Sequence, residues 1–233
     1  MTKTSSGITI YSDKISGSTR RVTTVLEHLD IEYAFEHLDI FKGEQMEPSF
    51  LAMNPNHFVP VMTDGDLTLW DAASINIYIS DTYDSSLLAK SGPERYETIK
   101  WMFWGAEHFR ANVVTFFAEN FGKRWQKQEP DQEALARADA QIRPWLQILD
   151  DHLSTRKWIV ADRFTLADLD VAGPFSQMLR TKAPYYDYPN VKKWHERMLE
   201  EIPAWRKTRA ELEDRIVELN KDFGSSLEVL NNR

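Results

Sequence analysis

The stretch that decides the fold is NPNHFVPVMTDGDLTLWDAASINIY, residues 54–78. It places a Val59-Pro60 step before a short apolar strand, an Asp64-Gly65 turn after that strand, and a second strand over residues 67–70. Asp-Gly between two apolar runs predicts a two-residue hairpin, because both central residues of a type I′ turn need a positive φ. We therefore expect an antiparallel pair of strands here.

The two ends of this hairpin predict a binding groove. Pro60 has no amide hydrogen for a strand ladder, so it must begin a strand or lie on an edge, and the backbone of Val59 is left free beside it. Asp71 directly precedes a helical pattern, where its carboxylate suits the N-cap. A free backbone segment beside a helix N-terminus predicts a groove for a peptide-like anion.

Composition indicates an ordinary globular protein and excludes several partners. Of the 233 residues, 42% are apolar and 27% are charged, and the formal net charge is −8. We expect no nucleic-acid partner, which would need a basic stripe, and no membrane surface for the same reason. The opening MTKTSSG has neither a charged segment nor an apolar segment of a targeting signal, and no run of about 18 apolar residues follows. We expect a cytoplasmic protein.

The chain has no cysteine. Disulfides, thiolate metal sites and cysteine nucleophiles are therefore excluded. The six histidines are dispersed and none forms an i, i+4 pair, so we expect no metal.

The order of predicted elements indicates an α+β protein with two domains. A strand at residues 8–11, a helix, a strand at 33–38, a short helix at 48–53, the hairpin and a helix over 71–83 make a βαβ-α-ββα order, which is thioredoxin-like. We expect this domain over residues 1–83, a small and polar linker over 84–92, and an all-helical bundle over 93–233. The charged helical segment from Ala210 onward is predicted to pack only lightly on the bundle.

Three segments in register carry a resemblance to a known family. NPNHFVPVMTDGDLTLWDAASI resembles the pattern NPxGxVPxLxDGDxxLxES of cytosolic glutathione transferases, with His57 in place of the glycine. ADRFTLAD, residues 161–168, resembles the family's GDRFTIAD segment, with Ala161 again in place of glycine. YPNVKKWHERM, residues 188–198, resembles the family's penultimate helix. The resemblance implies glutathione as co-substrate, a homodimer and a role in detoxification.

The chemistry that the resemblance implies needs a thiolate. A free thiol has a pKa of about 8.5, so the site must favour the anion. A hydroxyl at a helix N-terminus does this by donating a hydrogen bond to sulfur. SGSTRRV, residues 16–22, is similar to the SxxxxRV motif of the serine-type, bacterial or theta-like branch, which puts Ser16 on the catalytic serine. Ser16 or Ser18 as a plain helix N-cap, and Tyr11 at the end of the first strand, remain alternatives.

The resemblance also assigns the contacts to the rest of glutathione. Val59 and Pro60 pair with the cysteinyl part, and Asp71 and Ala72 hold the γ-glutamyl end, although Ala72 stands where the family has a serine. Gln45, in place of the family's histidine, is expected near the glycine carboxylate, with Lys42 compensating in charge.

The second substrate is expected to meet the sulfur against the first helix of the bundle. A small hydrophobic electrophile is predicted to lie against four residues of that helix: Trp104, His108, Ala111 and Thr115. Two other readings are a non-catalytic interaction or ligand-carrier module, which the change to Ala72 favours, and a glutathione-dependent lyase, etherase or dehalogenase.

Overall fold

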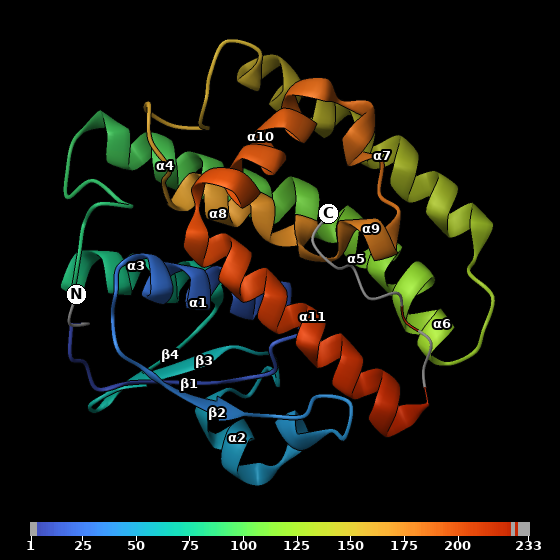
Figure 1. Cartoon of the computed structure of the whole chain (residues 1–233), viewed down its shortest axis with the longest axis horizontal. Coiled ribbons are helices and arrows are strands. Elements are labelled where there is room, and N and C mark those ends of the chain that lie inside the picture. Colours follow the sequence, from blue (N-terminus) through green and yellow to red (C-terminus); the bar gives the residue numbers. More distant parts are fainter. Residues whose placement is uncertain (1–3, 225–226, 228–233) are drawn as a thin grey trace.

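The computed structural model describes residues 4–224 and Leu227. Its first part contains a four-stranded sheet with α1 and α3 on one side and α2 on the other (Figure 1). The elements of this part, in chain order, are β1 (Ile8–Ser12), α1 (Gly17–His28), β2 (Ala34–His37), η1 (Glu44–Met46), α2 (Pro48–Met53), β3 (Val61–Asp64), β4 (Leu67–Trp70) and α3 (Ala72–Thr82).

The sheet has the strand order β2-β1-β3-β4. β1 pairs with β2 in parallel, while β3 is antiparallel to both β1 and β4. The predicted βαβ-α-ββα order is therefore confirmed. Pro60 immediately precedes β3, so it removes no hydrogen bond from the ladder, and the Val59–Pro60 peptide is cis.

The hairpin forms where it was predicted, but its turn is shifted by one residue. Asp64 pairs with Leu67, so the two central residues are Gly65 and Asp66, and of these only Gly65 has a positive φ, of 57°. The I′ prediction is therefore wrong. The Asp64 side chain instead anchors the hairpin to α3, because its carboxylate accepts hydrogen bonds from the hydroxyls of Tyr78, at 2.9 Å, and Tyr83, at 2.5 Å.

The second part of the chain is helical, as predicted. The first helix of this part begins at Pro93 and continues past Phe121, but two of its turns, η2 and η3, are π-helical. The elements of this part are α4 (Pro93–Trp104), η2 (Gly105–Phe109), α5 (Arg110–Phe117), η3 (Ala118–Gly122), α6 (Lys123–Trp125), α7 (Gln132–Leu153), α8 (Leu166–Ala172), η4 (Gly173–Gln177), α9 (Met178–Thr181), η5 (Tyr185–Asp187), α10 (Pro189–Glu201) and α11 (Pro203–Phe223).

A buried carboxylate organises the start of α8. Asp168 accepts hydrogen bonds from the backbone N–H groups of Ile159 and Thr165, both at 3.0 Å, and from Trp194 Nε1 at 2.9 Å. Burial raises the pKa of Asp168 to about 6, although these donors favour the charged form. The residue therefore ties the α8 N-terminus to the preceding loop and to α10.

α11 packs more firmly than the sequence predicted. Leu212, Ile216 and Leu219 are completely buried, and the helix lies against α1 in the first domain (Figure 1). The prediction of light packing is wrong, because the surfaces that cover this apolar face come from parts of the chain that are remote in sequence.

The expected linker contributes to the core. Leu87 and Leu88 are buried, and the Leu87 carbonyl accepts a hydrogen bond from the Leu166 N–H at 3.0 Å. The division at residues 84–92 stays a prediction.

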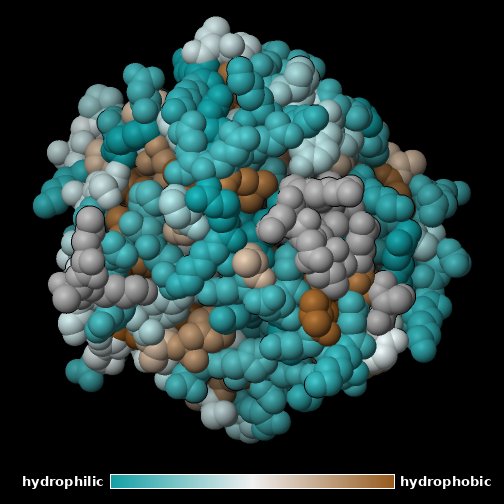
Figure 2. All heavy atoms as spheres, in the orientation of Figure 1, coloured by the Kyte–Doolittle hydropathy of each residue, from teal (hydrophilic) through white to brown (hydrophobic). Residues whose placement is uncertain are grey.

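The face of the molecule in Figure 2 is mainly hydrophilic, with its apolar side chains in small, separate groups. Such scattered apolar exposure is ordinary for a globular protein.

His195 makes stability depend on pH. The residue is 3% exposed, and neither ring nitrogen bonds to a described residue. Burial, together with the charges of Arg20 and Arg209, lowers the pKa of His195 to about 3. The folded state disfavours the protonated ring. The neutral His195 ring therefore makes its full contribution to the free energy of unfolding above pH 6.5, and this contribution is lost as the pH falls toward 3.

We expect the free energy of unfolding to fall by about 2 kcal/mol more in the wild type than in His195→Leu between pH 7 and pH 5. Urea unfolding at both pH values measures this difference. The exposed His37→Gln variant, as a control, should behave as the wild type does. Equal pH dependence in His195→Leu and the wild type would contradict the assignment.

Ala161 supplies a second test of the fold. Its φ is 57°, a left-handed conformation that costs a residue with a Cβ roughly 1–2 kcal/mol. We expect Ala161→Gly to stabilise the protein by about 1 kcal/mol, measured by urea unfolding. Ala140→Gly, in the exposed middle of α7, should destabilise it by about 1 kcal/mol. Destabilisation by both changes would mean that strain at Ala161 is negligible.

Candidate functional site

A cavity of about 910 Å³ lies between the two parts of the chain. We call it the cleft. Its walls come from the β1–α1 loop, the loops before α2 and β3, the start of α3, and the helices α5, η3 and η4. The candidate residues among its lining are Ser16, Gln45, Val59, Pro60, Asp71 and Ala72.

Ser16 is both a cleft residue and the N-cap of α1. Its Oγ accepts a hydrogen bond from the Thr19 N–H at 3.3 Å. A hydroxyl has one hydrogen to donate and two lone pairs, so capping leaves the Ser16 hydrogen available to another acceptor. The N-cap role and a role toward a ligand are therefore compatible in one side chain.

The two alternatives to Ser16 lie differently. Ser18 also lines the cleft, but its Oγ accepts a hydrogen bond from Arg21 Nη2 at 3.3 Å. Tyr11 is not among the residues that line the cleft, and it sits within β1 opposite Glu36 and Val61.

The start of α1 is pressed against η4. A Cβ added to Gly17 would lie only 2.9 Å from the carbonyl oxygen of Gly173, and one added to Gly173 would lie 2.5 Å from Cδ of Arg21. At Gly17 the obstacle is the backbone, and at Gly173 it is the Arg21 side chain, which its ion pair with Asp170 holds in place, so both positions favour glycine. This contact holds the N-terminus of α1 at the cleft wall.

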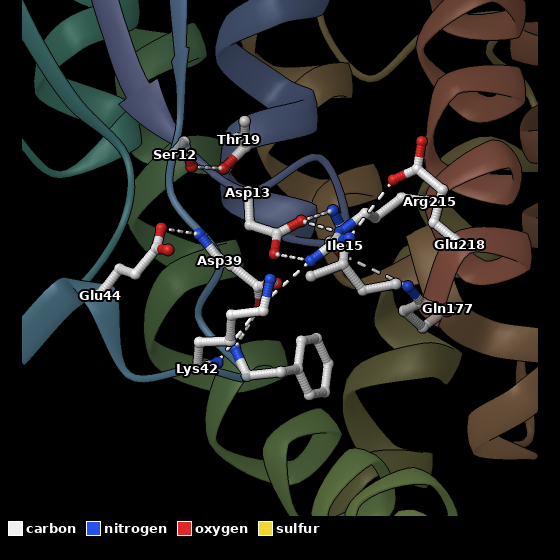
Figure 3. Close-up of polar contacts among 11 residues, drawn as sticks. Ser12, Asp13, Ile15, Thr19, Asp39, Lys42, Glu44, Gln177, Arg215 and Glu218 are labelled. Atoms are coloured by element: carbon white, nitrogen blue, oxygen red, sulfur yellow. Dashed lines mark hydrogen bonds and ion pairs between the residues drawn. The ribbon is translucent and has the colours of Figure 1, made fainter. Parts of the chain in front are cut away.

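Arg215 of α11 joins the β1–α1 loop to the loop after β2 by contacting Asp13 and Asp39 (Figure 3). Its Nε and Nη2 reach the two carboxylate oxygens of Asp13 at 3.1 and 3.2 Å, and Nη2 also lies 3.2 Å from Asp39 Oδ1. Asp13 in turn accepts from the Ile15 N–H at 3.1 Å. All three charged side chains are buried, so the loop that carries Ser16 is held from the far end of the chain.

Asp39 organises the loop after β2. Its carboxylate accepts hydrogen bonds from the N–H groups of Phe41, at 3.0 Å, and Lys42, at 3.2 Å. Burial alone would raise the pKa of Asp39, but the hydrogen bonds from Lys42 and Arg215 outweigh it and hold the pKa below its usual value. Phe41 is thereby fixed in the cleft wall.

Val59 presents its backbone as predicted by the sequence. It lines the cleft, and neither its N–H nor its C=O bonds to another described residue. His57, two residues earlier, has a φ of 52°, which explains why glycine suits that position.

Asp71 and Ala72 meet at the start of α3. Asp71 has a φ of 72°, uncommon for a residue other than glycine, and its Oδ1 caps the helix by accepting from the Ala73 N–H at 2.9 Å. Its Oδ2 lies 3.9 Å from Arg110 Nη1, across the cleft on α5. Both side chains are partly open to solvent, at 47% and 40% exposed.

Gln45 and Lys42 separate in the structure. Gln45 lines the cleft, and its Oε1 is buried without a hydrogen-bond partner among the described residues. Lys42 is not among the lining residues and pairs with Asp39 at 3.2 Å. Of the two, Gln45 is therefore the residue that can contact a ligand in the cleft.

The four residues predicted to face the second substrate are not in the cleft wall. Trp104 packs edge-on against Phe109, and His108 stacks on Trp145 of α7 with ring centroids 3.9 Å apart. Ala111 and Thr115 are also absent from the lining. The residues of α5 that do line the cleft are Arg110, Val113, Val114 and Phe117.

A π turn accounts for the difference at the two positions beyond it, Ala111 and Thr115. η2 lies between Trp104 and α5, and a π turn closes i→i+5 bonds instead of i→i+4 bonds. One extra residue rotates everything beyond it by about 100° relative to a regular helix. The sequence signal for the true face was the spacing of Arg110, Val113, Val114 and Phe117, at i, i+3, i+4 and i+7.

One end of the cleft is lined by aromatic rings. Phe41 packs on Trp125 with centroids 4.6 Å apart, and Phe117 stacks on Phe121, also at 4.6 Å. All four rings line the cleft. This end therefore suits a hydrophobic, planar group.

Within residues 4–224 and Leu227, no three histidine, aspartate or glutamate side chains gather as metal ligands would. None of the helices described there combines the length and the apolar character that crossing a bilayer requires.

Comparison with known proteins identifies the family. The model for the glutathione S-transferase N-terminal domain matches residues 15–82, and that for the C-terminal domain matches residues 99–201. The chain is 30% identical to glutathione S-transferase 1 of Schizosaccharomyces pombe over 213 residues, which cover 82% of this chain and 90% of that protein.

Solved structures agree with this match. Glutathione transferase F7 from Populus trichocarpa has the same fold, with a TM-score of 0.80 at 24% identity over 88% of this chain and 99% of that one. URE2P6 from Phanerochaete chrysosporium, in complex with oxidized glutathione, has a TM-score of 0.77 at 26% identity over 90% and 98%. With a thioredoxin-like sheet, a helical bundle and matches over most of its length, the chain belongs to the glutathione S-transferase family of enzymes.

Proposed function

We propose that the protein transfers glutathione to a hydrophobic electrophile, with the Ser16 hydroxyl stabilising the thiolate of bound glutathione. The observation that carries this proposal is the geometry of Ser16, which lines the cleft while its Oγ caps α1. A hydroxyl that accepts one hydrogen bond becomes a better donor in another. The N-terminal dipole of α1 adds a favourable potential for an anion at the same place. We assign the chain to the serine-type, bacterial or theta-like branch on this basis.

The remaining contacts of glutathione follow the order of the cleft residues. The free backbone of Val59, beside Pro60, would pair with the cysteinyl part, and Asp71 with the Ala72 N–H would take the γ-glutamyl end. Gln45, with its unpartnered buried oxygen, would donate from its amide nitrogen toward the glycine carboxylate. Lys42, held by Asp39, would contribute charge from outside the cleft.

The electrophile is proposed to bind at the aromatic end of the cleft. The rings of Phe41, Trp125 and Phe117 favour a planar hydrophobic molecule. Trp104, His108, Ala111 and Thr115 do not line this space, so they would act on the electrophile only through packing behind the wall.

We propose that the enzyme acts as a homodimer. Tyr96 and Phe103 lie seven residues apart on one face of α4 and are 71% and 64% exposed. Apolar side chains at this spacing suit burial against a second copy. Size-exclusion chromatography with light scattering should give twice the 27.2 kDa chain mass, and a monomer would contradict this proposal.

Ser16→Ala tests the catalytic proposal. We expect turnover to fall roughly tenfold or more, because one preorganised donor to the thiolate is lost. The ultraviolet thiolate band of bound glutathione, followed across pH, should show a raised thiol pKa, while glutathione affinity measured by calorimetry changes little.

Two further variants separate catalysis from helix capping. Ser16→Thr keeps the hydroxyl and should keep most of the turnover, whereas Ser16→Asp keeps the cap but has no hydrogen to donate and should lose it. Ser18→Ala is the neighbouring control. Unchanged turnover in Ser16→Ala would transfer the role to Ser18 or to the backbone. No binding of glutathione at millimolar concentration to the wild type would contradict the proposed function itself.

A further inference from the structure

Arg110 is a cation in the cleft that no hydrogen bond to a described residue occupies. Its side chain is 40% exposed and lines the cleft, and the nearest carboxylate oxygen, Asp71 Oδ2, lies 3.9 Å from its Nη1. That distance is too long for a hydrogen bond. The guanidinium donors of Arg110 are therefore available to a ligand that enters between the two side chains.

The other arginine of the cleft is already committed. Arg21 forms an ion pair with Asp170, in which both side chains are almost fully buried, and it also donates to Ser18 Oγ at 3.3 Å. It faces the same region, since its charge acts on Arg110. Burial and this neighbouring positive charge lower the pKa of Arg110, so an anion placed beside Arg110 would relieve the repulsion between the two guanidinium groups.

The pairing of Arg110 with Asp71 matches a particular chemical group. An α-amino acid end carries an ammonium and a carboxylate on the same carbon, and it needs an acid and a base on adjacent walls. Asp71 supplies the acid at the N-terminus of α3, and Arg110 supplies a planar fork of donors that fits a carboxylate. Ala72, which also lines the cleft, has no side-chain donor for that carboxylate.

We propose that Arg110 binds the α-carboxylate of the γ-glutamyl end of glutathione, while Asp71 takes the ammonium group. This inference rests on the proposed function. Arg110 is then a specificity-determining residue for the γ-glutamyl end, and it comes from the helical domain. It supplies the donor that the side chain of Ala72 lacks. The carboxylate enters the space between Arg110 and Asp71, and the existing 3.9 Å pair loosens to admit it.

Arg110→Gln is the first test, and Arg137→Gln is its matched control. Both changes remove one positive charge, but Arg137 lies on α7 with its side chain 65% exposed and is not among the cleft residues. We expect Arg110→Gln to raise the Kd for glutathione, measured by calorimetry, roughly tenfold to a hundredfold. Arg137→Gln should bind as the wild type does. Turnover at saturating glutathione and the pKa of the bound thiol should change little in Arg110→Gln.

A ligand analogue then locates the contact. γ-Aminobutyryl-cysteinyl-glycine lacks only the α-carboxylate of glutathione, so the wild type and Arg110→Gln should bind it equally weakly. If Arg110→Gln weakens binding of the analogue as much as that of glutathione, Arg110 acts elsewhere, for example on the sulfur, and the proposal is overturned. Unchanged glutathione affinity in Arg110→Gln overturns it as well.

A second variant guards against a folding defect. Arg110→Lys keeps the charge but loses the planar fork, and its glutathione Kd should lie between those of the wild type and Arg110→Gln. If Arg110→Gln fails to fold, the test depends on Arg110→Lys alone. A folded Arg110→Lys that binds glutathione and the analogue as tightly as the wild type does would count against the proposal. Failure of the wild type to bind glutathione would instead contradict the proposed function, so the two failures are distinguishable.

Discussion

The ion pair between Arg215 and Asp13 is the constraint on which the site depends. One guanidinium on α11 holds both Asp13, ahead of Ser16, and Asp39, ahead of Phe41, so it sets the spacing between the loop that carries Ser16 and the aromatic wall. The cost of burying three charges is offset only because both carboxylates are also bonded to backbone N–H groups. Removing the guanidinium alone would leave two buried carboxylates facing each other, which is far more costly than losing a surface pair.

The Ser16 hydroxyl caps α1 through one lone pair and keeps its hydrogen free to donate. Asp71 likewise combines two contacts in one side chain, because one carboxylate oxygen caps α3 and the other faces Arg110. Capping residues suit such roles, since they lie at helix ends where the backbone already favours anions and where the side chain is held in place.

The sequence predicted those parts of the structure that depend on neighbours in the chain. The hairpin, the Val59-Pro60 step and the caps at Ser16 and Asp71 each follow from residues only a few positions apart. The parts that depend on remote residues were not predictable. Arg215 lies 202 positions from Asp13, so the sequence around either residue does not identify the other. For the same reason α11 was expected to pack lightly, since the residues that cover it are far away in the chain. The face of α5 was missed for a different reason, since a π turn gives no periodic signal in sequence.

α1 belongs to the first part of the chain, but residues of the second part hold it in place. This helix follows the first strand of the thioredoxin-like sheet, yet Arg20 stacks on the Trp205 ring at 3.3 Å and donates to the Trp205 carbonyl, while Arg21 pairs with Asp170. Both guanidinium groups therefore find their partners in the helical bundle and not in water. In a fragment of residues 1–83, water would solvate both guanidinium groups instead, and these contacts would no longer hold α1 in place. The position of α1 at the cleft wall is therefore set by side chains from both parts of the chain.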